Sequence, residues 1–362
     1  MTGQRVETYL RGLIPEDPRA LTALGREHHI DPTDVIEVLG VIGKDCAGAV
    51  QFCLESEIPA VRHARGELEA ASDADIEARL AELRMGEEIS WTMPDEHWSL
   101  PGMQSKFAIR QQDGAWYWAL GAEPTTHIVK PGVRTLRHQA LVEYATMSAA
   151  AALGLNVAPV AYTDFHSERA IVIARFDRAV RDGRLSRLHQ EDLCQAMGER
   201  EKMESAGGPG TVRIIQFLRA IAPTRADGER AAAAFARGFI FNTVAAAPDA
   251  HARNYALLLD SPAPQLAPLY DLATGLPYDP APREFTAAMN VAGEFRFAQI
   301  ARAHWQAFAA SAHLDEAWVL SEVERFTAAL PDALRAALEP VDDWDGSVRE
   351  VRARLEAAFA RG

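Results

Sequence analysis

Between Lys106 and Lys130 the chain carries three short runs rich in apolar and aromatic residues that interrupt an otherwise helical pattern. The runs are KFAIR, AWYWAL and THIVK, and a Gln-Gln-Asp-Gly turn separates the first two. Runs of this composition, bounded by turn residues, are typical of antiparallel strands joined by tight turns. We therefore expect an antiparallel meander here, which excludes an all-helical fold.

Helical patterns surround this segment. Before it, we expect helices in VETYLRGLI, PRALTALGREHHI and PTDVIEVLG and a strand in AVQFCLE. A helix start with Pro at the first helical position is expected at Asp31-Pro32-Thr33-Asp34. After it, we expect a helix in LVEYATMSAAAALG that ends at Gly154, followed by strands in APVAYTDF and RAIVIARF. A long helical region is expected at residues 190–247, and a strand pair is expected in NYALLLD and QLAPL. This order indicates an α+β, bilobal fold.

The totals narrow the class of protein. A chain of 362 residues exceeds the size of most single cores, so more than one domain is expected. A net charge of −14, from 37 Lys and Arg against 51 Asp and Glu, argues against direct nucleic-acid binding. Cys46, Cys53 and Cys194 lack the spacing of a disulfide or metal site, and no membrane segment or signal core is visible. We therefore expect a cytoplasmic protein.

The stretch PDAHARNYALLL, residues 248–259, contains the strongest candidate for chemistry. Asp249 and Asn254 are five residues apart and precede an apolar strand, with His251 between them. An Asp that orients a hydroxyl, followed by an Asn that offers a neutral oxygen to Mg²⁺, is found in phosphoryl-transfer loops. The alternative is a polar loop whose Asp and Asn only satisfy backbone groups.

A second carboxylate strengthens the phosphoryl-transfer interpretation. Asp271 closes the apolar run LAPLYDLAT, seventeen residues after Asn254. A hairpin between the two would return Asp271 beside the loop that carries Asp249. Asn254 and Asp271 could then share a metal that bridges nucleotide phosphates. Taken alone, an Asp at a strand end is usually only a turn former.

Two further segments suit a nucleotide site. Lys130 ends the predicted strand THIVK, and Glu143 in the next helix is a candidate ion-pair partner, as in the strand-lysine to helix-glutamate pair of protein kinases. SLPGMQSKF, residues 99–107, precedes the first strand of the meander and has the single Gly102, a weak phosphate-loop pattern. The alternatives are an ordinary solvated lysine and a simple turn.

In this order the segments resemble the HipA family, the serine/threonine kinase toxins of bacterial type II toxin-antitoxin systems. The matching segments are VETYLRGLIPE, IGKDCAGAV, SLPGMQSKF, THIVKP, EYATMSAAAALGLNVAP, IARFDR, HQEDLCQAMG, GGPG, DAHARN and LYDL, which together span nearly the whole chain. The resemblance implies a protein-kinase-like fold with a β-rich N-lobe and a mostly helical C-lobe. Residues 1–90 would be a remnant of the family's N-terminal subdomain, residues 91–180 the nucleotide-binding lobe, and residues 181–362 the catalytic lobe.

The resemblance also implies roles for individual residues. Asp249 would be the catalytic base, Asn254 and Asp271 the Mg²⁺ ligands, Lys130 the lysine on the ATP phosphates, and Ser99 the serine that family members autophosphorylate. The segment from Pro101 to Lys106 would cover the phosphates, and Ala174 to Phe176 would form the hinge whose backbone meets the adenine. The implied nucleotide-binding residues are Pro101, Gly102, Met103, Gln104, Ser105, Lys106, Lys130, Ala174, Arg175, Phe176, His251, Ala252, Arg253, Asn254, Tyr270 and Asp271.

The implied function is an ATP- and Mg²⁺-dependent serine/threonine protein kinase toxin that phosphorylates a cytoplasmic protein, for which the family's example is glutamyl-tRNA synthetase. Its expected partner is a HipB-like helix-turn-helix antitoxin, with DNA bound only through that antitoxin. The chain departs from the family at Arg253, where a Lys is usual. From a length argument, we also expect about 60 residues of the family's N-terminal β structure to be absent. The alternatives are a small-molecule phosphotransferase of similar fold and an antitoxin-binding transcriptional co-regulator.

Overall fold

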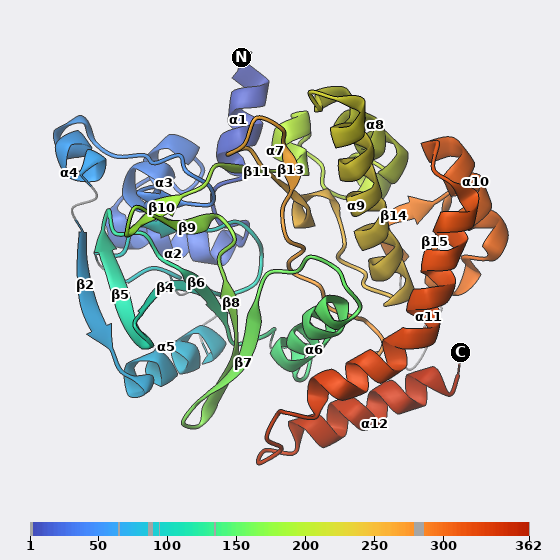
Figure 1. Ribbon diagram of the computed structural model, residues 1–362. Helices are drawn as coiled ribbons and strands as arrows, with labels where there is room; N and C mark the ends of the chain where they lie inside the picture. The colour runs from blue at the N-terminus through green and yellow to red at the C-terminus, as the bar shows by residue number, and fades with distance from the viewer. Residues whose placement is uncertain are drawn as a thin grey trace. The chain divides into compact units, whose positions relative to one another are not determined.

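The computed structural model describes residues 3–63, 66–85, 90–93, 95–133, 135–278 and 286–361 (Figure 1). The chain forms two compact units. Unit 1 comprises residues 1–140 and 159–191, and unit 2 comprises residues 141–158 and 192–362. The predicted α+β class, with a β-rich part and a helical part, is confirmed. The three predicted segments, 1–90, 91–180 and 181–362, stay a prediction.

A six-stranded sheet is the centre of unit 1 (Figure 1). Its order is β2-β5-β4-β6-β8-β7, and every neighbouring pair is antiparallel. The strands are β2 (Gly66–Ala71), β4 (Phe107–Gln112), β5 (Ala115–Gly121), β6 (His127–Lys130), β7 (Val160–Phe165) and β8 (Glu168–Ala174). The three runs that predicted strands therefore form β4, β5 and β6, and the two later runs form β7 and β8.

The predicted meander is wrong in its order. A meander would place β5 between its neighbours, but β4 is the central strand of the three. Arg110 of β4 pairs with Tyr117 of β5 on one side, and Phe107 pairs with Val129 of β6 on the other. The connection after β5 crosses the end of β4, so β6 joins the opposite edge of the hairpin.

Helix α5 (Asp73–Met85) covers one face of this sheet by packing against β7 and β8. Its apolar residues Ile76, Leu80 and Leu83 recur at helical spacing and are all buried. They join the buried strand residues Phe107, Ile109, Val129, Phe165 and Val172 in one core. Phe107 pairs with Val129, and Val129 with Val172, so these three side chains lie on one face of the sheet.

The N-terminal helices of unit 1 form a second core. They are α1 (Gly3–Arg11), α2 (Pro18–His28) and α3 (Val35–Ile42), with a short α4 (Ile58–Arg62) after them. The three predicted helices are thus present. The predicted start with Pro32 at the first position is wrong, because Asp34 caps α3 by accepting from the Ile36 and Glu37 amides. Pro18 holds that first position in α2 instead.

The strand predicted for AVQFCLE is also wrong. Residues 49–54 carry no strand, and Glu55–Glu57 form a short 3₁₀ turn. Phe52 packs against the N-terminal helix core instead of a sheet. The local strands are β1 (Asp45–Cys46), which pairs in parallel with β3 (Trp98–Ser99), and β2, whose sequence GELEAA has little apolar alternation.

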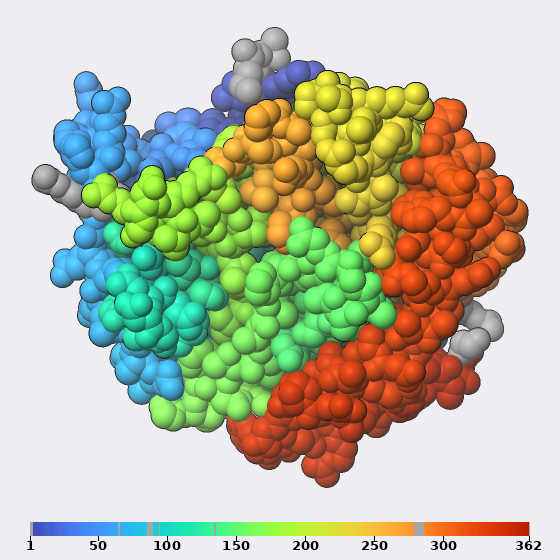
Figure 2. Space-filling model, viewed as in Figure 1, coloured from blue at the N-terminus to red at the C-terminus, as the bar shows by residue number. Residues whose placement is uncertain are grey.

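A buried network of charges joins distant parts of unit 1. Asp45 Oδ1 accepts hydrogen bonds of 2.7 Å from Arg178 and 2.7 Å from Arg187, and its Oδ2 accepts one of 2.7 Å from the Thr125 hydroxyl. Arg175 also lies 3.3 Å from Asp45 Oδ2 and bonds to both oxygens of Asp177. The strands β9 (Arg178–Arg181) and β10 (Arg184–Arg187) that bring in two of these arginines form the yellow-green hairpin in Figure 2.

The network keeps Asp45 ionised. Burial opposes ionisation, but the guanidinium groups of Arg178, Arg175 and Arg187 outweigh it and hold the pKa of Asp45 well below its usual range. The pKa of Asp177 is lowered by the same balance of burial against Arg175 and Arg178. Each buried charge therefore has a partner, which is the condition under which buried charges are tolerated.

Unit 2 is mostly helical (Figure 1). Most of α6 (Gln139–Ala152) belongs to it, and its other helices are α7 (Leu193–Met197), α8 (Thr211–Ile221), α9 (Arg225–Val244), α10 (Arg302–Ala312), α11 (Glu316–Leu338) and α12 (Ser347–Phe359). Helix α9 packs against α8 and α11. The predicted helical region 190–247 is therefore three separate helices, preceded by the strand β11 (Gln190–Asp192).

Aromatic side chains fill the core of unit 2. Phe239 of α9 contacts Trp305 and Phe308 of α10, with ring centroids 6.0 and 5.4 Å apart. Phe241 contacts Phe326 of α11 at 5.5 Å. The predicted strand pair is present as β12 (Ala256–Leu258) and β13 (Gln265–Leu266), and a second pair is β14 (Thr286–Val291) with β15 (Glu294–Arg296).

Helix α6 ends as predicted. Gly154 adopts a φ of 81°, and the amides of Gly154 and Leu155 bond back to the carbonyls of Ala151 and Ala150. This is the left-handed glycine stop that the sequence indicated. Across the residues that the structure describes, no helix is both long and apolar enough to span a membrane.

We expect Asp45→Asn to lower the free energy of unfolding at pH 7 by about 3–5 kcal/mol, because Arg187 loses its buried anion and Arg175 and Arg178 keep only Asp177. The pKa of Asp45 is lowered in the folded state, so its contribution is present above the unfolded pKa of about 4 and is lost as pH falls. Urea unfolding at pH 7 and pH 3 measures both effects, and the difference between variant and wild type should shrink at pH 3.

The matched control is Glu324→Gln, which removes an exposed ion pair with Arg302 in unit 2. Exposed pairs contribute little, so this variant should keep the wild-type unfolding midpoint. Equal losses in the two variants would contradict the role assigned to the buried network.

Candidate functional site

The loop from Asp249 to Asn254 is held by its own hydrogen bonds. The Asp249 carbonyl accepts from the His251 amide at 2.8 Å and from Asn254 Nδ2 at 2.7 Å. The Asn254 amide nitrogen also bonds to the His251 carbonyl at 2.9 Å. Because Nδ2 is committed to the backbone, the amide orientation that satisfies this bond makes Oδ1 the atom that Asn254 can offer to a cation.

Asp249 and His251 differ sharply in exposure. The Asp249 side chain is 73% exposed, whereas that of His251 is 4% exposed, and His251 Nε2 lies 3.4 Å from Asp249 Oδ1. A buried imidazole beside an exposed carboxylate can fix the direction of that carboxylate while leaving its other oxygen accessible. His251 is thus placed to brace this loop.

One hydrogen bond ties the segment of Asp271 to the Asp249 loop. Tyr270 Oη donates to the Arg253 carbonyl at 2.6 Å, so the residues that precede Asp271 and Asn254 are directly connected. Strands β12 and β13, between them, pair antiparallel, with Leu257 opposite Leu266. The hairpin predicted to return Asp271 to the loop is therefore present in unit 2.

Asp271 has an unusual backbone. Its φ is 58°, in the left-handed region that non-glycine residues rarely adopt. The following segment is held by Thr274, whose hydroxyl donates to the Ala245 carbonyl at 2.5 Å and whose amide bonds to the Thr146 hydroxyl at 3.1 Å. Strain that the surrounding bonds enforce is a common property of functional positions.

The donor set suits a hard divalent cation. Amide and carboxylate oxygens are the ligands that Mg²⁺ prefers, and Asn254 and Asp271 supply one of each. Within the described parts of the chain, no cluster of three or more His, Cys, Asp or Glu side chains could hold a metal by itself. A cation here would therefore need further oxygens from water or phosphate, which is how Mg²⁺ is usually bound beside nucleotides.

The neighbouring residues of this loop were not identified by sequence reasoning. The Ala252 amide bonds to the Lys202 carbonyl at 3.4 Å, and Arg253 donates to the Arg200 carbonyl at 3.2 Å. Residues 200–202 thus support the loop through backbone oxygens. Since any side chain leaves a backbone carbonyl in place, the sequence carries no signal for such contacts.

In unit 1, the segment from Pro101 to Lys106 is a fixed loop. Gly102 has a φ of 108°, a backbone conformation that favours glycine, and a Cβ there would lie 2.6 Å from Lys106 Nζ and displace that ammonium group. Lys106 Nζ donates to the Pro101 carbonyl at 2.6 Å and lies 5.2 Å from the Trp91 ring centre. Lys106 therefore shapes the loop from within.

Other residues of this loop differ in their surroundings. Met103 is 52% exposed, Ser105 is half-buried, and Gln104 Nε2 donates to Gln139 Oε1 at 2.8 Å. The Gly102 carbonyl accepts from the Glu16 amide at 3.0 Å, which ties the loop to the N-terminal segment. The exposed residue of the loop is thus Met103, whereas Lys106 is buried.

Ser99 is fully buried. Its hydroxyl donates to the Leu13 carbonyl at 2.7 Å, and the residue is 0% exposed. In this conformation no phosphate donor can reach the hydroxyl. Phosphorylation of Ser99 would therefore require the segment around it to leave its position.

The remaining predicted residues of unit 1 lie on the sheet. Lys130 ends β6 and is buried. The backbone amides of Ala174 and Arg175 bond to Pro159 and Thr126, so a nucleotide base would have to use other polar atoms of the 174–176 segment. The Arg175 side chain belongs to the buried charge network. Glu143 is buried in unit 2, so its predicted ion pair with Lys130 stays a prediction.

Comparison with known proteins gives two family matches. Residues 98–334 match the HipA-like C-terminal domain, and residues 1–53 match the HipA N-terminal domain. Y4mE of Sinorhizobium fredii, described as a candidate kinase, is 30% identical over 92% of this chain and 79% of its own length. The serine/threonine-protein kinase toxin HipA of Shewanella oneidensis is 25% identical over 96% of this chain and 81% of its own length.

A solved structure agrees with these matches. A chain from the complex of Shewanella oneidensis MR-1 HipA, HipB and operator DNA aligns with a TM-score of 0.82 at 25% identity. The alignment covers 99% of this chain and 86% of the other. Names and fold together support a kinase, that is, a phosphotransferase.

We expect Asp271→Gly to be more stable than Asp271→Ala by about 1–2 kcal/mol. Both variants lack the carboxylate, but only alanine has a Cβ, which is strained in the left-handed backbone conformation. Thermal unfolding of the two variants measures the difference. Equal stabilities would show that the φ of 58° is not maintained in solution.

Proposed function

Because this chain belongs to the HipA family, we propose that it is an ATP- and Mg²⁺-dependent serine/threonine protein kinase that acts as the toxin of a type II toxin-antitoxin system. The observation that carries the proposal is the loop Asp249–Asn254, fixed by the 2.7 Å bond from Asn254 to the Asp249 carbonyl and tied to Asp271 by Tyr270. This arrangement supports phosphate transfer because it combines an accessible carboxylate with two preset oxygen donors.

In the proposed reaction, Asp249 orients the hydroxyl of the protein substrate and accepts its proton. His251 supports it by limiting rotation of the carboxylate. Asn254 Oδ1 and the Asp271 carboxylate would hold Mg²⁺, which when bound neutralises charge on the ATP phosphates. Lys130 and the loop from Pro101 to Lys106 are assigned to those phosphates. Most of the acceleration would then come from positioning and charge neutralisation.

Regulation and partners follow the family. The relative in the HipB and operator DNA complex supports a HipB-like antitoxin as the partner of this chain, with DNA bound through it. Autophosphorylation is assigned to Ser99, and its burial supports an inhibitory role because the modified side chain, with a double negative charge, could not return to its site against Leu13.

We expect Asp249→Asn to lower the rate of phosphate transfer from ATP by about 10²- to 10⁴-fold, the usual contribution of a general base. Transfer of labelled phosphate to protein measures the rate, and circular dichroism checks the fold. Asp260→Asn, the same chemical change at an exposed position after β12, is the control and should keep full activity. Undiminished transfer by Asp249→Asn would remove it from the role.

We expect Asp271→Asn to weaken the apparent affinity for Mg²⁺ at least about tenfold, because the site loses its one charged oxygen donor. Calorimetric titration of adenine nucleotide at several Mg²⁺ concentrations measures this change. Nucleotide binding in the absence of Mg²⁺ should be unaffected, which separates metal loss from a damaged nucleotide site. An unchanged Mg²⁺ dependence would contradict the assignment.

A further inference from the structure

Strand β2 forms one edge of the sheet of unit 1. This strand is the terminal member of the sheet and pairs with β5 along all six residues without a bulge. In Figure 1 it runs along the outside of the sheet, and Figure 2 shows this blue segment at the surface beside the teal β4–β5 hairpin. A straight, unbulged edge strand is a template for pairing with another extended chain.

The pairing register tells which backbone groups face outward. Asp113 and Gly114, with φ of 51° and 81°, form the two-residue turn between β4 and β5, so Gln112 and Ala115 are a hydrogen-bonded pair. Backbone N–H and C=O groups point alternately to the two sides of a strand, so those of Trp116, Trp118 and Leu120 point away from β4 and toward β2. The β2 residues opposite these three therefore form the hydrogen bonds to β5. The outward backbone groups are therefore those of Gly66, Leu68 and Ala70, and no described backbone group outside β5 bonds to them.

The side chains along this edge are acidic. Glu67 and Glu69 are exposed and lie on one face of β2, two residues apart. Neither forms a hydrogen bond or an ion pair with the described residues. A second copy of this chain would bring the same glutamates against them, and a nucleic-acid backbone would be repelled. The charge instead fits an extended segment with Lys or Arg at alternate positions.

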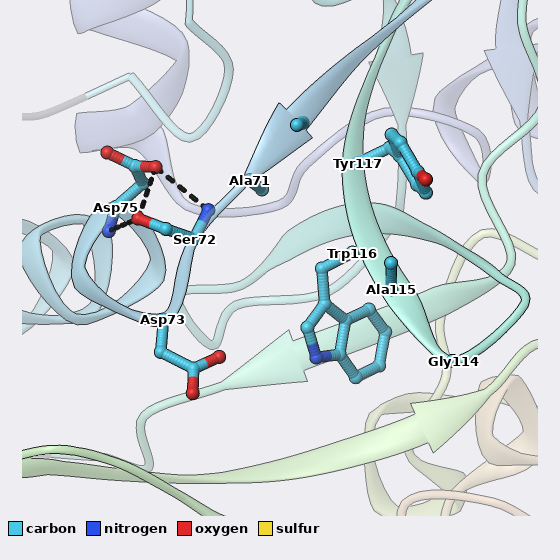
Figure 3. Close-up of a pocket in the computed structure, with 9 residues that line it drawn as sticks. Ala71, Ser72, Asp73, Asp75, Gly114, Ala115, Trp116 and Tyr117 are labelled. Atoms are coloured by element: carbon cyan, nitrogen blue, oxygen red, sulfur yellow. Dashed lines mark hydrogen bonds between the residues drawn. The ribbon is translucent and has the colours of Figure 1, made fainter.

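A hollow of about 380 Å³ continues the edge at the end of β2. Its lining includes Asp73, Asp75, Trp116 and Tyr117 (Figure 3). Asp75 is already bonded to the Ser72 amide and hydroxyl, at 2.8 and 2.6 Å. Asp73 is exposed and forms no such bond to any described residue. In Figure 3 its carboxylate points toward the part of the hollow where the Trp116 ring lies. A carboxylate beside an indole suits a cationic side chain.

We propose that β2 binds an extended basic peptide segment of a partner protein as a seventh strand, with one Lys or Arg side chain in the hollow beside Asp73 and Trp116. The backbone groups of Gly66, Leu68 and Ala70 give the pairing, and the glutamates select the charge. The surface uses none of the residues assigned to phosphate transfer, so it stands apart from the proposed function.

Fluorescence anisotropy with a labelled Lys-Val-Arg-Val-Arg-Val-Lys peptide tests the proposal on the full chain. Two N-methylated versions of the peptide are compared, one modified on the valine backbone amides and one on the arginine backbone amides. They have the same charge, but each lacks the backbone N–H donors on a different side of the extended peptide. A strand added to β2 presents only one set to the protein, so one version should lose binding at least about tenfold and the other should bind normally. Equal binding of both versions would overturn strand addition.

Charge selection is tested by Glu67→Lys/Glu69→Lys, which should weaken binding of the unmodified peptide at least about tenfold, and by Asp73→Asn, which should weaken it less. The control is Glu82→Lys/Glu339→Lys, the same charge change at two exposed positions away from β2. If both double variants weaken peptide binding equally, the peptide is attracted by the net charge of the protein, and the assignment of the binding site to β2 is wrong. Sedimentation that shows wild-type dimers abolished by Glu67→Lys/Glu69→Lys would assign the edge to a second copy and overturn the proposal.

Discussion

The carboxylate of Asp45 is the contact on which much of unit 1 depends. It collects Arg175, Arg178 and Arg187 around one buried anion, and the Thr125 amide and hydroxyl bind the same group. These partners come from the end of β8, the β9–β10 hairpin and the connection before β6. Because an unpaired charge in this position would be costly, the network fixes the relative positions of all three elements.

The same anchor reaches the proposed phosphate loop by a short path. Asp45 and Cys46 pair in parallel with Trp98 and Ser99, and the next residues lead directly into the loop that begins at Pro101. The loop is then held by Lys106 on its inner side. The conformation of the loop is therefore set before any ligand binds, which reduces the conformational entropy that is lost on binding.

The sequence predicted local features well and long-range ones poorly. Strand composition identified β4, β5 and β6, and the spacing of Asp249, Asn254 and Asp271 identified a hairpin that the structure contains, because both signals lie within short stretches. The order of strands, with β4 in the centre, and the arginine partners of Asp45, at least 130 residues away, depend on tertiary packing that no local pattern encodes. AVQFCLE shows the opposite error, since its apolar residues serve a helical core.

Two stretches far apart in the chain are bonded to each other at several points. Leu13 accepts from the Ser99 hydroxyl, the Glu16 amide donates to the Gly102 carbonyl, and Val41 accepts from His97. Such stretches open together or not at all, as a single cooperative unit. Amide hydrogen exchange in residues 97–102 should consequently follow that of the N-terminal helices, so the loop would report on loosening of a region more than 50 residues earlier in the chain.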